Sequence, residues 1–93
     1  MSKFNNVPAE QDTKILFSQE AILGEYDVLY QKWYWDGVTA ESIIFLAEDI
    51  FGLNDDEIKK EVQDSPLVNG GSSITLKRSD SGYVFVNFNF IAE

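Results

Sequence analysis

The spacing of apolar residues changes once along this chain, and the change limits the folds that the chain can adopt. Before the loop at 68–73 (VNGGSS), apolar residues recur at steps of three and four, which is the period of an amphipathic helix. After this loop they alternate with polar residues, as in a strand. Helices followed by strands are typical of an α+β domain. The sequence therefore predicts an α+β fold, with about three N-terminal and central helices packed against a C-terminal antiparallel β-hairpin.

The first helix is expected over about residues 19–35. Ser18 is a suitable N-cap and Gly37 a suitable residue after the last turn. The apolar positions follow the helical period over the whole segment. The expected apolar face consists of Ile22, Leu23, Tyr26, Leu29, Tyr30 and Trp33.

Two features of the same segment favour strands instead. Gly24 weakens a helix interior by about 1 kcal/mol relative to alanine. Segment 26–35 (YDVLYQKWYW) is rich in aromatic residues, which favour strands. An extra short strand at 14–17 (KILF) or at 26–35 is therefore the alternative.

The second helix is expected between Thr39, a candidate N-cap, and Gly52, which ends it. Its apolar residues also follow steps of three and four. The expected apolar face consists of Ile43, Ile44, Leu46, Ala47, Ile50 and Phe51.

The third helix has the clearest local signal. Asn54 can cap it, and Glu57 three residues later can complete a capping box. Ile58 and Val62 are expected to face the core. The helix should end before the segment 64–66 (DSP).

The C-terminal hairpin is indicated by two alternating runs, at 74–77 and 83–90, around the turn 79–82 (SDSG). An isolated hairpin is barely stable in water, so one face must pack on the helices. We expect this inward face to carry Val84, Val86, Phe88 and Phe90. Tyr83 and Phe85 lie on the opposite face and are exposed if nothing covers it.

The domain organisation follows from the same pattern. Residues 1–12 are polar and are expected to form a loosely ordered arm, and 13–93 to form a single α+β domain. No apolar run approaches the roughly 20 residues that span a bilayer, and the N-terminus has no apolar signal-peptide stretch. We expect a cytoplasmic protein that does not contact membranes.

Composition excludes most catalytic chemistry. The 93 residues include no cysteine and no histidine, so thiol nucleophiles, imidazole bases and the usual zinc ligands are absent. Adjacent acids such as Glu48 and Asp49 diverge on a helix, and no spacing matches a calcium loop or a phosphate-binding loop. We predict no catalytic residues, no metal, no cofactor and no small-molecule substrate, and hence no enzyme.

The net charge is −9, from seven basic and sixteen acidic residues. Residues 36–65 hold two basic and nine acidic side chains, so this segment alone contributes −7. Such a surplus would repel a phosphate backbone, so direct nucleic-acid binding is not expected. A basic protein is the expected partner.

Several of these acids are placed against the dipoles of the expected helices. The dipole of the third helix stabilises negative charge in its first turn, where Asp55, Asp56 and Glu57 lie. Five others fall at or after helix C-termini, where negative charge is disfavoured: Asp36, Glu48, Asp49, Glu61 and Asp64. A local conflict of this kind is expected where binding overrides stability.

Consecutive aromatic residues provide a second candidate feature. Trp33 belongs to the expected core face, and on a helix Tyr34 and Trp35 cannot both share it. Tyrosine and tryptophan beside a charge such as Asp36 are typical of binding hot spots. Trp35 could equally cover the edge of the core.

Together these features predict a small acidic inhibitor. Most favoured is an immunity protein or antitoxin that occludes the cleft of a cationic nuclease toxin. The alternatives are a phage-type DNA mimic that inhibits a host nuclease or defence complex, and a non-inhibitory acidic subunit or adaptor. The expected partner-binding residues are Tyr34, Trp35, Asp36, Glu48, Asp49, Glu61 and Asp64.

Overall fold

The computed structural model describes residues 3–5, 7–8 and 13–92. These residues form five strands, one α-helix and one 3-10 helix. The elements, in chain order, are β1 (Lys14–Leu23), β2 (Tyr26–Trp35), β3 (Val38–Leu46), η1 (Ala47–Ile50), α1 (Asp55–Gln63), β4 (Thr75–Arg78) and β5 (Tyr83–Ala92).

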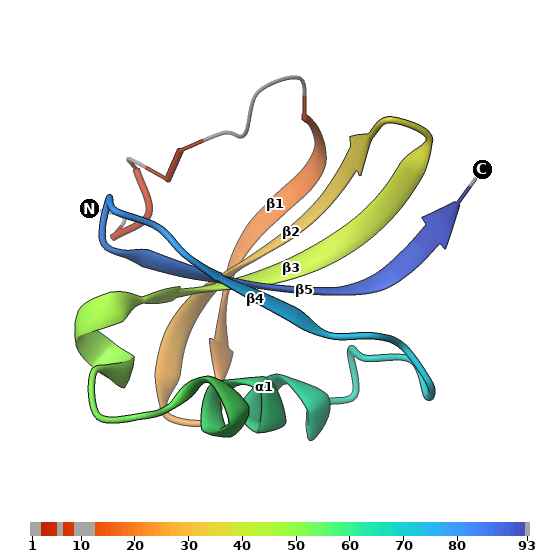
Figure 1. Cartoon of the computed structure of the whole chain (residues 1–93). Helices are drawn as coiled ribbons and strands as arrows, with labels where there is room; N and C mark the ends of the chain where they lie inside the picture. The colour runs from red at the N-terminus through yellow and green to blue at the C-terminus, as the bar shows by residue number, and fades with distance from the viewer. Residues whose placement is uncertain (1–2, 6, 9–12, 93) are drawn as a thin grey trace.

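The strands form a single antiparallel sheet in the order β1-β2-β3-β5-β4. Figure 1 shows α1 lying across one side of this sheet and the described N-terminal residues 3–5 and 7–8 on the other. The two faces are called here the α1 face and the arm face. The predicted fold of three helices packed on a hairpin is therefore wrong, because strands make up most of the structure.

The expected helix at 19–35 is a β-hairpin made by β1 and β2. Leu23 pairs with Tyr26 across a two-residue turn, in which Gly24 takes a φ of +61°. A two-residue hairpin turn of type II′ needs such a value at its first central position, and glycine adopts it without strain. The alternative strand at 26–35 is confirmed, and residues 14–17 lie within β1.

The apparent helical period in this hairpin comes from residues that the sheet separates. Tyr26 and Tyr30 pack on the α1 face, whereas Leu29 is buried on the arm face. Ile22, expected in the core, is 74% exposed on the edge strand. The steps of three and four therefore do not describe one continuous surface.

The expected second helix is the central strand β3, followed by the single turn of η1. Ile43 and Phe45 pack on the α1 face, and Ile44 and Leu46 on the arm face. A strand buried on both faces has a continuous apolar run, which periodicity alone does not distinguish from a buried helix.

The predicted third helix is confirmed as α1. Asn54 caps it: the Glu57 backbone N–H donates to Asn54 Oδ1 at 2.9 Å, and the Asn54 backbone N–H donates to Glu57 Oε1 at 3.0 Å. Ile58 and Val62 are fully buried against the sheet. The helix ends at Gln63 with Asp64 as its C-cap, as expected.

The predicted C-terminal hairpin is confirmed as β4 and β5. Val84, Val86 and Phe88 pack on the α1 face as expected, but Phe90 does not. Phe88 pairs with Glu41 and Ile91 with Thr39, so two residues of β5 lie opposite one residue of β3. This β-bulge turns Phe90 to the arm face, where its ring meets that of Trp33 edge-on at 6.5 Å.

The arm face is partly covered by the start of the chain. Phe4 is buried there, with its ring centroid 6.3 Å from that of Tyr83. The Tyr83 hydroxyl donates to the Lys3 carbonyl oxygen at 3.3 Å. Tyr83 is therefore buried rather than exposed. The prediction of a loosely ordered arm concerns residues that lie partly outside the described ones, and it stays a prediction.

Candidate functional site

Three elements place acidic side chains around Tyr26 at one end of the sheet. The β1–β2 turn carries Glu25, η1 carries Asp49, and the last turn of α1 carries Glu61. A Cβ at Gly24 would lie 3.8 Å from Glu61 Oε2, so α1 reaches this turn. Partial burial raises the pKa of the Tyr26 phenol, and the negative charges of these three carboxylates raise it further.

Two more acids belong to the same end of the molecule, on the arm side. Lys3 Nζ forms an ion pair with Asp27 Oδ2 at 3.2 Å. The hydrogen bond to Asp27 and the negative charge of Asp27 raise the pKa of Lys3 most. The charges of Asp49 and Glu48 raise it further. We call the five carboxylates of Glu25, Asp27, Glu48, Asp49 and Glu61 the acidic end.

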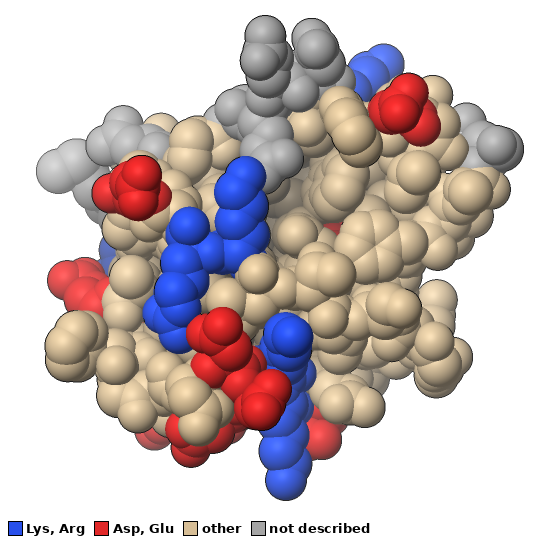
Figure 2. Space-filling model, viewed as in Figure 1, with Lys and Arg blue, Asp and Glu red and all other residues tan. Residues whose placement is uncertain are grey.

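Within the described part of the chain, the acidic end is poorly neutralised. Asp27 has its ion pair with Lys3, and the other four acids form no ion pair with a described residue. On the surface over β4 and α1, by contrast, acidic and basic side chains lie close together. Figure 2 shows basic side chains gathered over β4 and α1 with acidic side chains beside them, and the Arg78 guanidinium there binds Asp55 Oδ1 at 2.8 Å.

A large aromatic side chain is exposed next to the acidic end. Phe51 directly follows η1 and is 90% exposed, whereas its neighbour Ile50 is buried. The prediction that Phe51 belongs to an apolar core face is wrong, because the chain leaves η1 there instead of continuing a helix. The Phe51 ring therefore contributes little to the core, and it lies two residues from Asp49 in the chain.

The predicted aromatic anchors lie elsewhere. Tyr34 and Trp35 end β2, and Asp36 and Gly37 form the tight turn to β3 with φ values of 49° and 79°. Trp35 is 48% exposed and Tyr34 is half-buried. The length of β3, nine residues at about 3.3 Å each, separates this turn from Glu48 and Asp49 by roughly 30 Å.

The helix-dipole argument for the acids holds at two positions and fails at three. Asp36 occupies a hairpin turn of the Asp-Gly type, which explains its presence locally. Glu48 and Asp49 lie in the first turn of η1, not at a helix C-terminus. Glu61 and Asp64 do lie at the end of α1, where negative charge is disfavoured.

The structure therefore brings together only part of the predicted set. Glu48, Asp49 and Glu61 share the acidic end, Asp64 caps α1, and Tyr34, Trp35 and Asp36 form a separate group. Sequence reasoning missed Glu25, Asp27 and Phe51. A signal existed for the first two, because Gly24-Glu25 is a possible hairpin turn that would carry its flanking acids to one end of a sheet.

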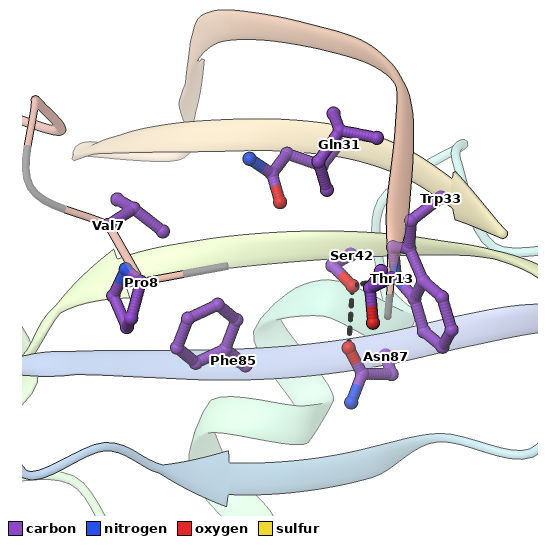
Figure 3. A pocket seen from close by; sticks show the side chains of 9 residues that line it. Val7, Pro8, Thr13, Gln31, Trp33, Ser42, Phe85 and Asn87 are labelled. Carbon is purple, nitrogen blue, oxygen red and sulfur yellow. Dashed lines mark hydrogen bonds between the residues drawn. The ribbon is translucent and has the colours of Figure 1, made fainter. Parts of the chain in front are cut away.

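The arm face holds a pocket of about 160 Å³ between the sheet and the N-terminal segment. Figure 3 shows Trp33, Ser42 and Asn87 together on its floor, and Val7 and Pro8 at its other end. Trp33 Nε1 donates to Ser42 Oγ at 2.6 Å, and Ser42 Oγ donates to Asn87 Oδ1 at 2.5 Å. These polar groups satisfy one another, as buried groups must.

Comparison with known proteins found no matching family model, no matching curated protein and no matching solved structure. Among the described residues, acidic side chains do not gather in a geometry that could hold a metal ion. The longest described helix, α1, has nine residues, and none of the described helices could cross a membrane. The functional argument therefore depends on the surface itself.

Proposed function

We propose that this protein is an acidic inhibitor of a cationic protein, and that it acts as an immunity protein or antitoxin against a nuclease. The observation that carries the proposal is the acidic end, where five carboxylates from the β1–β2 turn, β2, η1 and α1 converge beside one exposed aromatic ring. The sequence-level charge surplus supports the same partner class.

Inhibition would occur by occlusion. A nuclease cleft is lined with cations that bind phosphates, so a rigid cluster of carboxylates can take the places of those phosphates. Long-range attraction then accelerates association, and burial of a ring such as Phe51 slows dissociation. Lys3, which is paired with Asp27, is a cation that the partner must displace or accommodate at this surface.

The rigidity of the acidic end supports this mechanism. Glu25 is held by a two-residue turn, Glu48 and Asp49 by η1 next to the buried Ile50, and Glu61 by a capped helix. The backbone at these positions is already ordered, so binding has to order the carboxylate side chains but not the chain that carries them. The proposal places the protein in the cytoplasm, where a nuclease toxin would reach its substrate.

The test combines capture with an inhibition assay. The full chain is immobilised, lysate of the source cells is applied at low salt, and the captured protein is purified and assayed for nuclease activity. We expect a basic protein whose nuclease activity the free wild-type chain abolishes. The double variant Glu48→Lys with Asp49→Lys should inhibit poorly.

The matched control is Asp56→Lys with Asp80→Lys. These two acids are exposed and lie outside the acidic end, and their reversal changes the net charge by the same amount. The control should inhibit as the wild type does. Equal inhibition by both double variants would refute the proposal, and so would a captured partner that has no nuclease activity. A partner that is a non-nuclease subunit of an assembly would support the adaptor alternative instead.

A further inference from the structure

The two edges of the sheet differ sharply. The β4 edge has four residues, of which Lys77 and Arg78 are charged, and short charged edges resist pairing with other strands. The β1 edge has ten residues, nine of them exposed, and Lys14 and Glu20 are the charged residues among them. Long, weakly charged edges are templates for an added strand.

The β1 edge also exposes apolar side chains on both faces of the sheet. Ile15 pairs with Trp33 on the arm face and is 39% exposed, and Ile22, on the same face, is 74% exposed. Phe17 lies on the α1 face, where its ring is 6.0 Å from that of Tyr30, and it is 48% exposed. These side chains are placed to contact a strand added next to β1.

We propose that β1 pairs with β1 of a second copy of this chain, antiparallel and about a two-fold axis at Gln19, to form a continuous ten-stranded sheet. In an antiparallel pair, residues directly opposite each other point to the same face. The axis at Gln19 satisfies this rule. Because β1 has a bulge at Leu16, Ile15 occupies the register position next to Phe17.

This register matches apolar with apolar residues. Phe17 lies opposite Ala21 of the second copy, and Ile15 lies opposite Ile22, each contact occurring twice by symmetry. Ser18 lies opposite Glu20, and Gln19 lies opposite itself. Apolar cross-strand pairs of this kind stabilise a sheet, whereas like charges directly opposite each other destabilise it.

The neighbouring registers are worse. An axis at Glu20 places the two Glu20 carboxylates opposite each other, and an axis at Ser18 places Ile15 opposite Glu20. An axis at Phe17 leaves Ile22 without a partner, and an axis at Ala21 leaves Ile15 and Phe17 without one. The axis at Gln19 is the one among these five that pairs Ile15, Phe17 and Ile22 with apolar residues. Leu16 is also exposed, but it is the bulged residue and has no position opposite.

The charge distribution also favours antiparallel pairing. With a net charge of −9 on each copy, contact between the two acidic ends would be strongly repulsive. Antiparallel pairing directs the two acidic ends away from each other, toward opposite ends of the joined sheet. It also brings Lys14 of each copy opposite Leu23, next to the turn that carries Glu25 of the other copy.

The experiment is analytical ultracentrifugation of the full chain, without any partner. We expect a concentration-dependent shift from 10.6 kDa toward twice that mass. Gln19→Lys and Gln19→Glu should each be monomeric, because each places two like charges on the axis. Gln19→Lys also makes the chain less acidic, so general repulsion cannot explain its loss of dimer.

A mixture of the two Gln19 variants provides the decisive measurement. The introduced lysine of one copy then faces the introduced glutamate of the other, and the mixed dimer should form. Gln63→Lys, the same substitution at an exposed position on α1, should dimerise as the wild type does. A wild type that stays monomeric at every concentration, or Gln19 variants that dimerise alone, would overturn the proposal. The outcome is independent of nuclease binding, because Glu48→Lys with Asp49→Lys should still dimerise.

Discussion

The Tyr30 hydroxyl donates a hydrogen bond of 2.5 Å to the Glu41 carboxylate, between two adjacent strands on the α1 face. Asn89 Nδ2 donates to the other oxygen of Glu41 at 2.7 Å. Burial raises the pKa of Tyr30 to about 12, and the hydrogen bond to Glu41 and its negative charge contribute to the rise. This pair ties β2 and β3 to the bulge in β5.

The first prediction concerns stability at high pH. The Tyr30 phenol has an ordinary pKa of 10.0 and a folded-state value of about 12, so folding favours its protonated form. Its contribution to the free energy of unfolding is complete below about pH 10 and is lost as the pH rises toward 12. Denaturant unfolding at several pH values should show this loss.

Two variants make that prediction specific. Tyr30→Phe should abolish the phenolate that appears last in an ultraviolet titration and should flatten the loss of stability above pH 10. Glu41→Gln should lower the pKa of Tyr30, because the negative charge is gone, while burial still holds it above its ordinary value. An unchanged Tyr30 titration in Glu41→Gln would contradict this assignment.

The second prediction concerns Asn89, whose φ is 56°. Its side chain donates to the Leu67 carbonyl oxygen and accepts from the Asn69 backbone N–H, both at 2.8 Å, in addition to bonding Glu41. Asn89→Ala removes these bonds and adds backbone strain, and should lower the free energy of unfolding by about 3 kcal/mol.

Asn89→Gly separates the two contributions. The glycine variant loses the same side-chain bonds, but glycine adopts positive φ freely. The decrease in its free energy of unfolding should therefore be about 1 kcal/mol smaller than that of the alanine variant. Equal losses in the two variants would show that the bulge carries no backbone strain.

The third prediction concerns the N-terminal segment. Phe4 is 6% exposed and packs on Tyr83, so Phe4→Ala should destabilise the fold by about 3 kcal/mol in denaturant unfolding. The exposed neighbour Asn5 is the control, and Asn5→Ala should change the stability by less than about 0.5 kcal/mol. A neutral Phe4→Ala would mean that the segment does not cover the arm face in solution.

Local signals predicted α1 and the C-terminal hairpin well. Asn54 and Glu57 form the capping box within three residues of each other, and β4 and β5 are joined by a short turn. Both elements depend on contacts that are close in sequence, so short-range chemistry decides them.

The first half of the chain was predicted wrongly because its patterns are ambiguous without tertiary contacts. The apolar run of β3 arises from burial on both faces, which requires α1 and Phe4 on opposite sides of the sheet. Asp36-Gly37 suits the end of a helix, but Asp-Gly between aromatic and β-branched residues is also a hairpin signal. The acidic end was found only in part, because Glu25 joins it through the β1–β2 turn.

The fourth prediction separates two candidate anchors. Phe51 lies at the acidic end, and Trp35 lies roughly 30 Å away at the other end of β3. Phe51→Ala should accelerate dissociation from the captured partner, measured by surface plasmon resonance, with little effect on folding because the ring is exposed. Trp35→Ala should leave dissociation unchanged if the partner contacts the acidic end alone. Faster dissociation in Trp35→Ala would instead support the sequence-based prediction of Trp35 as an anchor.

The central claim is that the acidic end attracts a cationic partner, and the most direct measurement is the rate of association at increasing ionic strength. Charges on separate molecules are screened beyond about 8 Å at physiological salt. We predict that association of the wild type slows steeply as salt rises, and that Glu48→Lys with Asp49→Lys is slow with a weak salt dependence. The control Asp56→Lys with Asp80→Lys should keep most of the wild-type dependence. Identical salt dependence in the two double variants would contradict the account.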